Sequence, residues 1–140
     1  MADRVDAATR SRIMSRVRSK DTGPELAMRK ALWAAGVRGW RCHVRSVPGT
    51  PDLCWQGRRV AVFVDSAWWH GHPSRWKPGR QPPKWDKKIR ANRQRDEEVN
   101  RRLDEAGWTT LRIWDFEIAS DIDTAVRRVQ MTLATTEKAD

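Results

Sequence analysis

Hydrophobic residues recur along the chain with two spacings, one typical of helices and one of strands. Spacings of three and four predict helices over residues 6–18, 22–35, 83–106 and 122–133. Strand-like stretches cover residues 40–47, 52–55, 59–65 and 108–114, with turn signals between them. The run Val60–Val64 is apolar on both faces, as expected of a central strand in a covered sheet. The pattern predicts an α/β fold with a mixed β-sheet flanked by helices.

The long helix predicted at 83–106 carries polar residues on its apolar stripe. The stripe runs through Ile89, Asn92, Asp96, Val99 and Leu103. A buried, unpaired carboxylate is costly, so Asp96 needs a partner, and His70 is the best candidate. A carboxylate on one imidazole nitrogen fixes the tautomer and raises the basicity of the other nitrogen. Alternatively, the helix is rotated and Asp96 begins an exposed acidic patch with Glu97 and Glu98.

Two aspartates flank a predicted hairpin. Asp52 opens one strand and Asp65 closes the next, so both carboxylates could lie beside the backbone carbonyl of Val64. Such an all-oxygen environment suits Mg²⁺, although an Asp after a proline is also common in simple turns. Glu25 is the third residue after Thr22 in a capping box, and its helical face could also direct it inward.

Charge along the chain is unevenly distributed. The 140 residues, enough for one domain, carry a net charge of +10 and have a pI near 10.7. Residues 75–95 hold nine basic residues and one acidic residue, whereas residues 96–140 hold six basic and eleven acidic residues. The basic segment favours nucleic acid as the partner, with a solvated loop as the alternative.

Tryptophan is unusually frequent, with nine Trp, two Phe and no Tyr. Trp68 and Trp69 are consecutive and therefore difficult to bury together, which makes them candidates for wedges between base steps. Trp85 lies among basic residues, a combination typical of nucleic-acid contacts. Its basic neighbours are Lys84, Lys87 and Lys88. Core packing is the alternative, to which we assign Trp33, Trp108 and Trp114.

The cysteines and histidines predict neither a disulfide framework nor a zinc site. Cys42 and Cys54 are the two cysteines, and their spacing to His70 and His72 matches no common zinc ligand set. The N-terminus lacks the apolar segment of a signal peptide, and no apolar run approaches the length of a membrane helix. We expect a cytoplasmic, nucleoid-associated protein without membrane contact.

Several ordered motifs resemble those of the very short patch repair (Vsr) endonucleases. The resemblance runs from about Ala8 to Trp114. Its motifs are Ala8-Thr9-Arg10-Ser11 with Met14, Asp21-Thr22 with Glu25, Pro48-Gly49-Thr50-Pro51-Asp52, Val62-Phe63-Val64-Asp65, Trp69-His70, Trp85 with Lys88-Ile89, Asn92, Arg95-Asp96, Gly107-Trp108 and Ile113-Trp114. The resemblance implies a restriction-endonuclease-like fold. It also implies Mg²⁺-dependent nicking of duplex DNA beside a T:G mismatch, leaving a 5′ phosphate.

The resemblance also implies roles for individual residues. Asp52 would be the principal metal ligand beside the Val64 carbonyl, His70 would be a catalytic acid or base oriented by Asp96, and Glu25 would hold a metal-bound water. The implied DNA contacts are the wedge residues Trp68, Trp69 and Trp85 and the arm residue Met14, together with Arg10, Lys84, Lys87 and Lys88. We therefore expect a DNA-contacting arm at 1–20 and an endonuclease domain at 21–136 with a basic loop at 66–82.

This chain departs from the family pattern at two places. Asp65 stands where some members carry a second catalytic His, so it either replaces that group or adds a metal ligand. Of the four structural zinc positions, His72 is kept, whereas the three Cys positions hold Ala67, Ser74 and Phe116. We expect no structural zinc, and loop 66–82 must be ordered by its aromatic residues or by DNA.

The sequence therefore predicts a monomeric, strand-specific nickase acting on double-stranded DNA, with mismatch-repair proteins such as MutL as further partners. Two alternatives remain open at this point. One is a related restriction or defence nuclease with another DNA target. The other is a catalytically silent module that binds distorted DNA.

Overall fold

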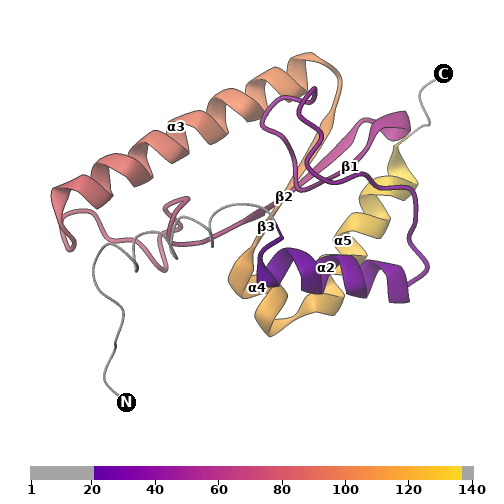
Figure 1. Ribbon diagram of the computed structural model, residues 1–140, viewed down its shortest axis with the longest axis horizontal. Helices are drawn as coiled ribbons and strands as arrows, with labels where there is room; N and C mark the ends of the chain where they lie inside the picture. Colours follow the sequence, from indigo (N-terminus) through magenta and orange to yellow (C-terminus); the bar gives the residue numbers. More distant parts are fainter. Residues whose placement is uncertain (1–20, 137–140) are drawn as a thin grey trace.

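A small mixed sheet lies at the centre of the computed structural model, which describes residues 21–136 (Figure 1). In this part of the chain the strand order is β1-β2-β3. β2 (Val60–Asp65) pairs antiparallel with β1 (Leu53–Trp55) and parallel with β3 (Thr109–Trp114). The prediction that the apolar run forms a central strand is confirmed, and the α/β class with it.

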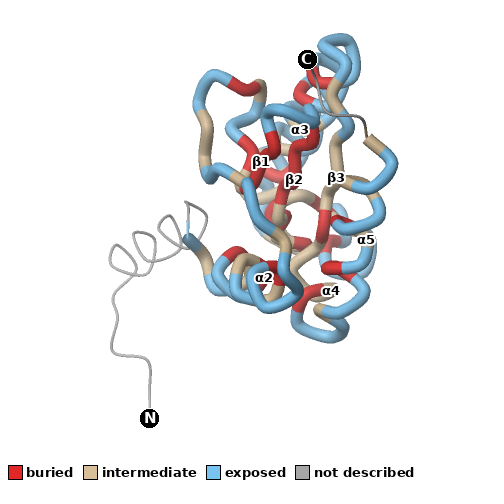
Figure 2. Tube along the Cα trace, turned by 90° about the vertical axis from the view of Figure 1, so that its right-hand side faces the viewer, coloured by how far each residue is buried: buried red, intermediate tan, exposed pale blue. Residues whose placement is uncertain are grey.

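Helices cover both faces of this sheet. α2 (Gly23–Ala34), α4 (Asp115–Ser120) and α5 (Ile122–Thr135) lie on one side, and α3 (Pro83–Glu105) lies on the other (Figure 1). Along β2, Val60 and Val62 pack into the α2/α5 core, while Ala61 and Phe63 pack with residues of α3. Since strand residues alternate between faces, Asp65 lies on the α3 face. Figure 2 shows the buried residues concentrated along the strands and the inner helix faces.

α3 has the orientation that its apolar stripe predicts. Ile89, Val99 and Leu103 are buried, and Asn92 and Asp96 are half-buried on the same side. The alternative of a rotated helix with an exposed Asp96 is therefore wrong.

Two elements differ from the sequence prediction. Residues 40–47 do not form a strand: they contribute a single bridge, Arg41 to Cys54, and His43 has a φ of 54°, which an extended strand excludes. α4 was not predicted, because its six residues are too few to show a helical period. Its first turn is held by Asp115, whose Oδ1 accepts the backbone N–H groups of Ala67 and Phe116.

The assignment of Trp33 to the core is wrong, because its side chain is 59% exposed. It follows Leu32 on α2, and since the core stripe takes Met28 and Leu32, the next position turns toward solvent. Arg38 covers its ring, 3.3 Å from the ring centroid. Trp108, by contrast, packs against the α3-side core.

Loop 66–82 is held by aromatic packing. Trp69, Trp76 and Ile89 form a separate apolar cluster, and the Trp76 indole donates to Asp86 at 2.9 Å. The predicted helix 6–18, and Arg10 and Met14 with it, lies outside the described residues. Within residues 21–136, no helix combines the length and hydropathy needed to cross a bilayer.

Candidate active site

The acidic residues and the histidine that the sequence predicts to be catalytic line one cavity of about 680 Å³. The cavity lies between α3, the N-terminus of α2 and the end of β2. Among the residues that line it are Glu25, Asp52, Asp65, His70, Asp96 and Arg112. The structure therefore brings all five predicted catalytic residues together and adds Arg112.

His70 and Asp96 form a close pair. His70 Nδ1 lies 2.5 Å from Asp96 Oδ2, and Nε2 lies 3.8 Å from Asp65 Oδ1. Burial alone would lower the pKa of His70, but the hydrogen bond to Asp96 and the charges of Asp65 and Asp96 raise it above its ordinary value. These contacts therefore favour the protonated form of the imidazole.

Gly71 allows the His70 backbone to approach α3. Its φ is +69°, and a Cβ at this position would lie 2.7 Å from Arg93 Cδ and 3.0 Å from Ile89 Cγ2. On α3, the Asn92 side chain donates to the carbonyl of Trp69 at 2.9 Å. Two polar residues on the stripe of α3 therefore hold this part of the loop. Asn92 binds the backbone of Trp69, and Asp96 binds the side chain of His70.

Asp65 is paired with an arginine that the sequence analysis missed. Asp65 is 3% exposed, and Arg112 Nη1 contacts both of its carboxylate oxygens, at 3.0 and 3.2 Å. Burial raises the pKa of Asp65, while His70 and Arg112 oppose that shift. A signal for Arg112 existed in the sequence, namely a charged residue between two apolar residues of a strand, Leu111 and Ile113, but its partner could not be read from the sequence.

Asp52 occupies a different corner of the cavity. Its Oδ2 accepts the backbone N–H of Val64 at 2.6 Å. The turn before it depends on Gly49, where a Cβ would lie 2.5 Å from Val99 Cγ1. Burial, together with the nearby Glu25 carboxylate, raises the pKa of Asp52 to about 7, despite the Val64 hydrogen bond. Asp52 is therefore a half-buried carboxyl group whose surroundings favour its protonated form far more than water does.

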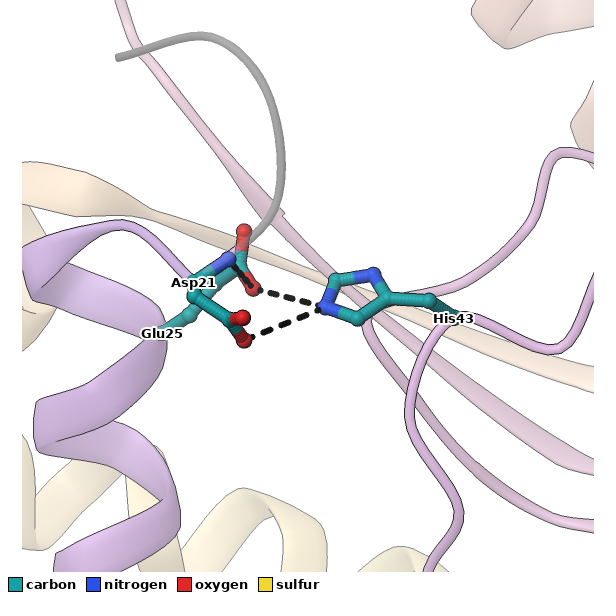
Figure 3. A group of neighbouring side chains, drawn as sticks. All are labelled: Asp21, Glu25 and His43. Atoms are coloured by element: carbon teal, nitrogen blue, oxygen red, sulfur yellow. Dashed lines mark hydrogen bonds and ion pairs between the residues drawn. The ribbon is translucent and has the colours of Figure 1, made fainter. Parts of the chain in front are cut away.

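Glu25 belongs both to the helix cap and to the site. Its backbone N–H is capped by the Thr22 hydroxyl, and its carboxylate accepts the N–H of Asp21 at 3.0 Å. Figure 3 shows the His43 imidazole pointing at both carboxylates, with Nε2 3.2 Å from Glu25 Oε2 and 3.7 Å from Asp21 Oδ1. His43 Nδ1 in turn lies 3.9 Å from Asp52 Oδ1. We found no signal in the sequence for this role of His43.

Two groups of side chains among the described residues could hold a metal ion: Asp21 with Glu25 and His43, and Asp65 with His70 and Asp96. Asp52 belongs to neither group, although it lines the same cavity. In the first group Arg29 already contacts both carboxylates, at 2.9 and 3.7 Å. The predicted ligands Asp52 and Asp65 thus share a cavity but have different partners.

The aromatic residues predicted to contact DNA lie beside this cavity. Trp68 and Trp85 are half-buried and pack on Trp69, which is 6% exposed. Lys84 Nζ lies 4.9 Å from the Trp85 ring centroid, and Lys88 Nζ lies 5.4 Å from that of Trp69. A direct contact of Trp69 with bases would require this cluster to open.

Comparison with known proteins identifies the family to which the chain belongs. The model of the family described as DNA mismatch endonuclease Vsr matches residues 2–76, more than half of the chain. The chain belongs to this family. It is 38% identical over 135 residues to the Type II nicking enzyme V.XorIIP of Xanthomonas oryzae, covering 95% of this chain and 98% of that protein.

A second relative links the chain to the enzyme after which the family is described. This relative is the DNA mismatch endonuclease Vsr of Escherichia coli. The chain is 33% identical to it over 117 residues, which cover 82% of this chain and 74% of that protein. Membership confirms the prediction of a Vsr-type endonuclease and agrees with the mixed α/β fold.

The positions that match the Vsr zinc site lie together in this chain. The His72 ring packs against Trp114 and Phe116, with centroids 4.8 and 4.9 Å apart. His72 Nδ1 accepts the backbone N–H of Ser74 at 3.0 Å and lies 2.8 Å from its hydroxyl. Here an aromatic and hydrogen-bonded cluster occupies the positions at which the resemblance implies three thiolates. The absence of zinc stays a prediction.

Proposed function

We propose that the protein is a Mg²⁺-dependent endonuclease that nicks one strand of duplex DNA at a T:G mismatch and leaves a 5′ phosphate. The observation that carries this proposal is the convergence of Asp52 and Glu25 with the His70–Asp96 pair in one cavity. A module that only binds distorted DNA would have no need for this arrangement.

The residues around Asp52 fit a hard divalent cation. Carboxylate and carbonyl oxygens are the ligands that Mg²⁺ prefers, and the raised pKa of Asp52, about 7, indicates a carboxylate in need of a compensating positive charge. We assign the ion to Asp52, with the Val64 carbonyl and Asp65 as further ligands. A bound cation would polarise the phosphodiester and offset the charge that develops during hydrolysis.

We assign proton transfer to His70. The hydrogen bond to Asp96 and the nearby carboxylates raise the pKa of His70, which favours the protonated imidazole and suits donation of a proton to the 3′ oxygen as it leaves. Asp96 holds Nδ1 and thereby directs Nε2 into the cavity. We assign Glu25, which lines the same cavity, to holding a metal-bound water.

We assign the opening of the duplex to Trp68 and Trp85, supported from beneath by Trp69. The rings of Trp68 and Trp85 are half-buried beside the cavity, and aromatic side chains can wedge between base steps. Lys84, Lys87 and Lys88 lie on the same first turns of α3 and would neutralise phosphates. The further assignments, which rest on family resemblance, are Met14 and Arg10 in the arm, action as a cytoplasmic, nucleoid-associated monomer, and cooperation with a protein such as MutL.

A nicking assay on end-labelled duplexes tests this proposal. Matched T:A and mismatched T:G duplexes of one sequence are incubated with and without Mg²⁺, and product ends are checked for a 5′ phosphate. We expect nicks in one strand of the mismatched duplex, and only when Mg²⁺ is present. If the protein cuts no duplex at any Mg²⁺ concentration, the proposed endonuclease activity is refuted.

The same assay separates the target classes. Several relatives carry the name Type II nicking enzyme, so the duplex set includes varied flanking sequences and 5-methylcytosine. Cutting of matched duplexes at a particular sequence would replace the mismatch target by a restriction-type target while keeping the active site. Trp68→Ala and Trp85→Ala should weaken binding to the mismatched duplex about tenfold, and Trp33→Ala, on the far helix, serves as the matched control.

A further inference from the structure

A single guanidinium contacts both carboxylates that flank His70. Arg112 Nη1 lies 3.0 Å from Asp65 Oδ2 and 3.5 Å from Asp96 Oδ1. These two aspartates approach the imidazole from its Nε2 and Nδ1 sides, at 3.8 and 2.5 Å. Arg112 is therefore linked to His70 through the two aspartates that flank the imidazole.

Arg112 is in turn held on several sides. Its Nε donates to Asn100 Oδ1 of α3 at 2.8 Å, and its guanidinium lies 4.2 Å from the centroid of the Phe63 ring. Phe63 is its register partner across the parallel β2–β3 pair, so ring and guanidinium share the α3 face. The planar fork of an arginine is thus fixed by a hydrogen bond at one edge and an aromatic ring at its face.

We propose that Arg112 is a positioning residue for the nicking reaction, clamping Asp65 and Asp96 so that His70 keeps one orientation toward the cavity. The inference rests on the proposed function. The carboxylates of Asp65 and Asp96, which flank one imidazole, repel each other, and the repulsion is strong where water is scarce. Without the guanidinium, Asp65 or Asp96 would rotate away, and His70 would lose its fixed partner at Nδ1.

Substitution of Arg112 separates this role from a contact with DNA. Single-turnover nicking at saturating enzyme reports the chemical step, and the Kd for the duplex is measured separately. We expect Arg112→Gln to lower the single-turnover rate about 100-fold with a change in Kd of less than about twofold. Arg112→Lys keeps the charge but loses the fork, so it should recover part of the rate. A weakened Kd with an unchanged rate would instead make Arg112 a phosphate contact and overturn the proposal.

Arg101→Gln is the matched control, since Arg101 is an exposed arginine of α3 that pairs with Glu98 and Glu105 outside the cavity. It should leave rate and Kd unchanged. Asn100→Ala removes the acceptor of Arg112 Nε and should lower the rate in the same direction by a smaller factor. If Arg112→Gln does not fold, Arg112→Lys and Asn100→Ala carry the test, and wild-type rates in both would refute the inference.

A spectroscopic measurement keeps this test independent of nicking. The His70 Nδ1 proton, shared with Asp96, should give a downfield ¹H resonance that His70→Gln removes. We expect the resonance to broaden or shift in Arg112→Lys and to stay in place in Arg101→Gln. An unchanged resonance in Arg112→Lys and Arg112→Gln would refute the clamp. Absence of nicking by the wild-type protein would refute the proposed function and leave this result standing.

Discussion

The cavity has two acidic corners that differ in how the protein compensates their charge. Asp65, with 5% of its side chain exposed, meets the guanidinium of Arg112 and lies near His70. Asp52, with 19% exposed, meets a backbone N–H and lies 3.9 Å from a His43 nitrogen. Burial raises the pKa of both, to about 7 for Asp52. Asp65 is compensated by an arginine and Asp52 by a backbone N–H, so we assign the metal chiefly to Asp52, with Asp65 as a further ligand, and proton transfer to His70.

The largest expected effect comes from removing the charge at the Asp52 corner. Asp52→Asn retains an acceptor for the Val64 N–H but not the anion, so it should lower the nicking rate by at least about 1,000-fold and abolish Mn²⁺ binding. Mn²⁺ binding is measured by electron paramagnetic resonance, and the rate by single-turnover nicking. DNA affinity should change by less than about threefold. Nicking by Asp52→Asn at the wild-type rate would show that the Asp52 corner does not hold the catalytic metal.

The second effect concerns the His70 corner. Asp96→Asn should lower the nicking rate about 100-fold, because the amide no longer stabilises the protonated imidazole or fixes its tautomer. Mn²⁺ affinity should remain that of the wild type, in contrast to Asp52→Asn. The control is Glu97→Gln, one residue along α3 and exposed. Loss of Mn²⁺ binding in Asp96→Asn would mean that the metal lies at the His70 corner.

The pH dependence of metal binding should report Asp52. Because its pKa is about 7 in the metal-free protein, a proton must leave before a cation binds, and the apparent Mn²⁺ affinity should fall up to about tenfold per pH unit below pH 7. The folded pKa lies above the ordinary value of 3.8, so the metal-free fold holds a proton that the unfolded chain has lost.

The stability of the metal-free protein should therefore fall as pH rises from about 4 to about 7, and this slope should be weaker in Asp52→Asn. Thermal unfolding across this range provides the measurement. A pH-independent Mn²⁺ affinity between pH 6 and pH 8 would place the metal away from Asp52.

The sequence predicted which residues form the site better than it predicted which of them contact one another. Periodicity placed Asp96 on the inner face of α3, and its predicted pairing with His70 is confirmed, because a charge on a buried stripe requires a partner. Arg112 and His43 were missed, because their partners come from segments 47 and 18 residues away in sequence: Asp65 for one, Glu25 for the other.

The fold shows the same limit. Hydrophobic patterning located β2 and α3, whereas residues 40–47 look strand-like but do not continue as a strand beyond the Arg41 bridge, because the backbone at His43 is left-handed. Local patterns report burial, but they do not report the backbone conformation of a single residue or the register that brings Phe63 beside Arg112.

The smallest expected effect sharpens the comparison at the Asp52 corner. His43 lies between Glu25 and Asp52, with Nε2 3.2 Å from Glu25 Oε2 and Nδ1 3.9 Å from Asp52 Oδ1, so its ring limits the space in which the Glu25 carboxylate can move. His43→Gln should weaken Mn²⁺ binding about two- to fivefold, because a more mobile carboxylate must be ordered when the cation binds. At saturating metal the nicking rate should equal that of the wild type, since His43 contacts Asp21, Glu25 and Asp52 and not the His70–Asp96 pair. A lowered rate at saturating metal, with Mn²⁺ affinity unchanged, would assign His43 to the chemical step and show that the two corners act as a single unit.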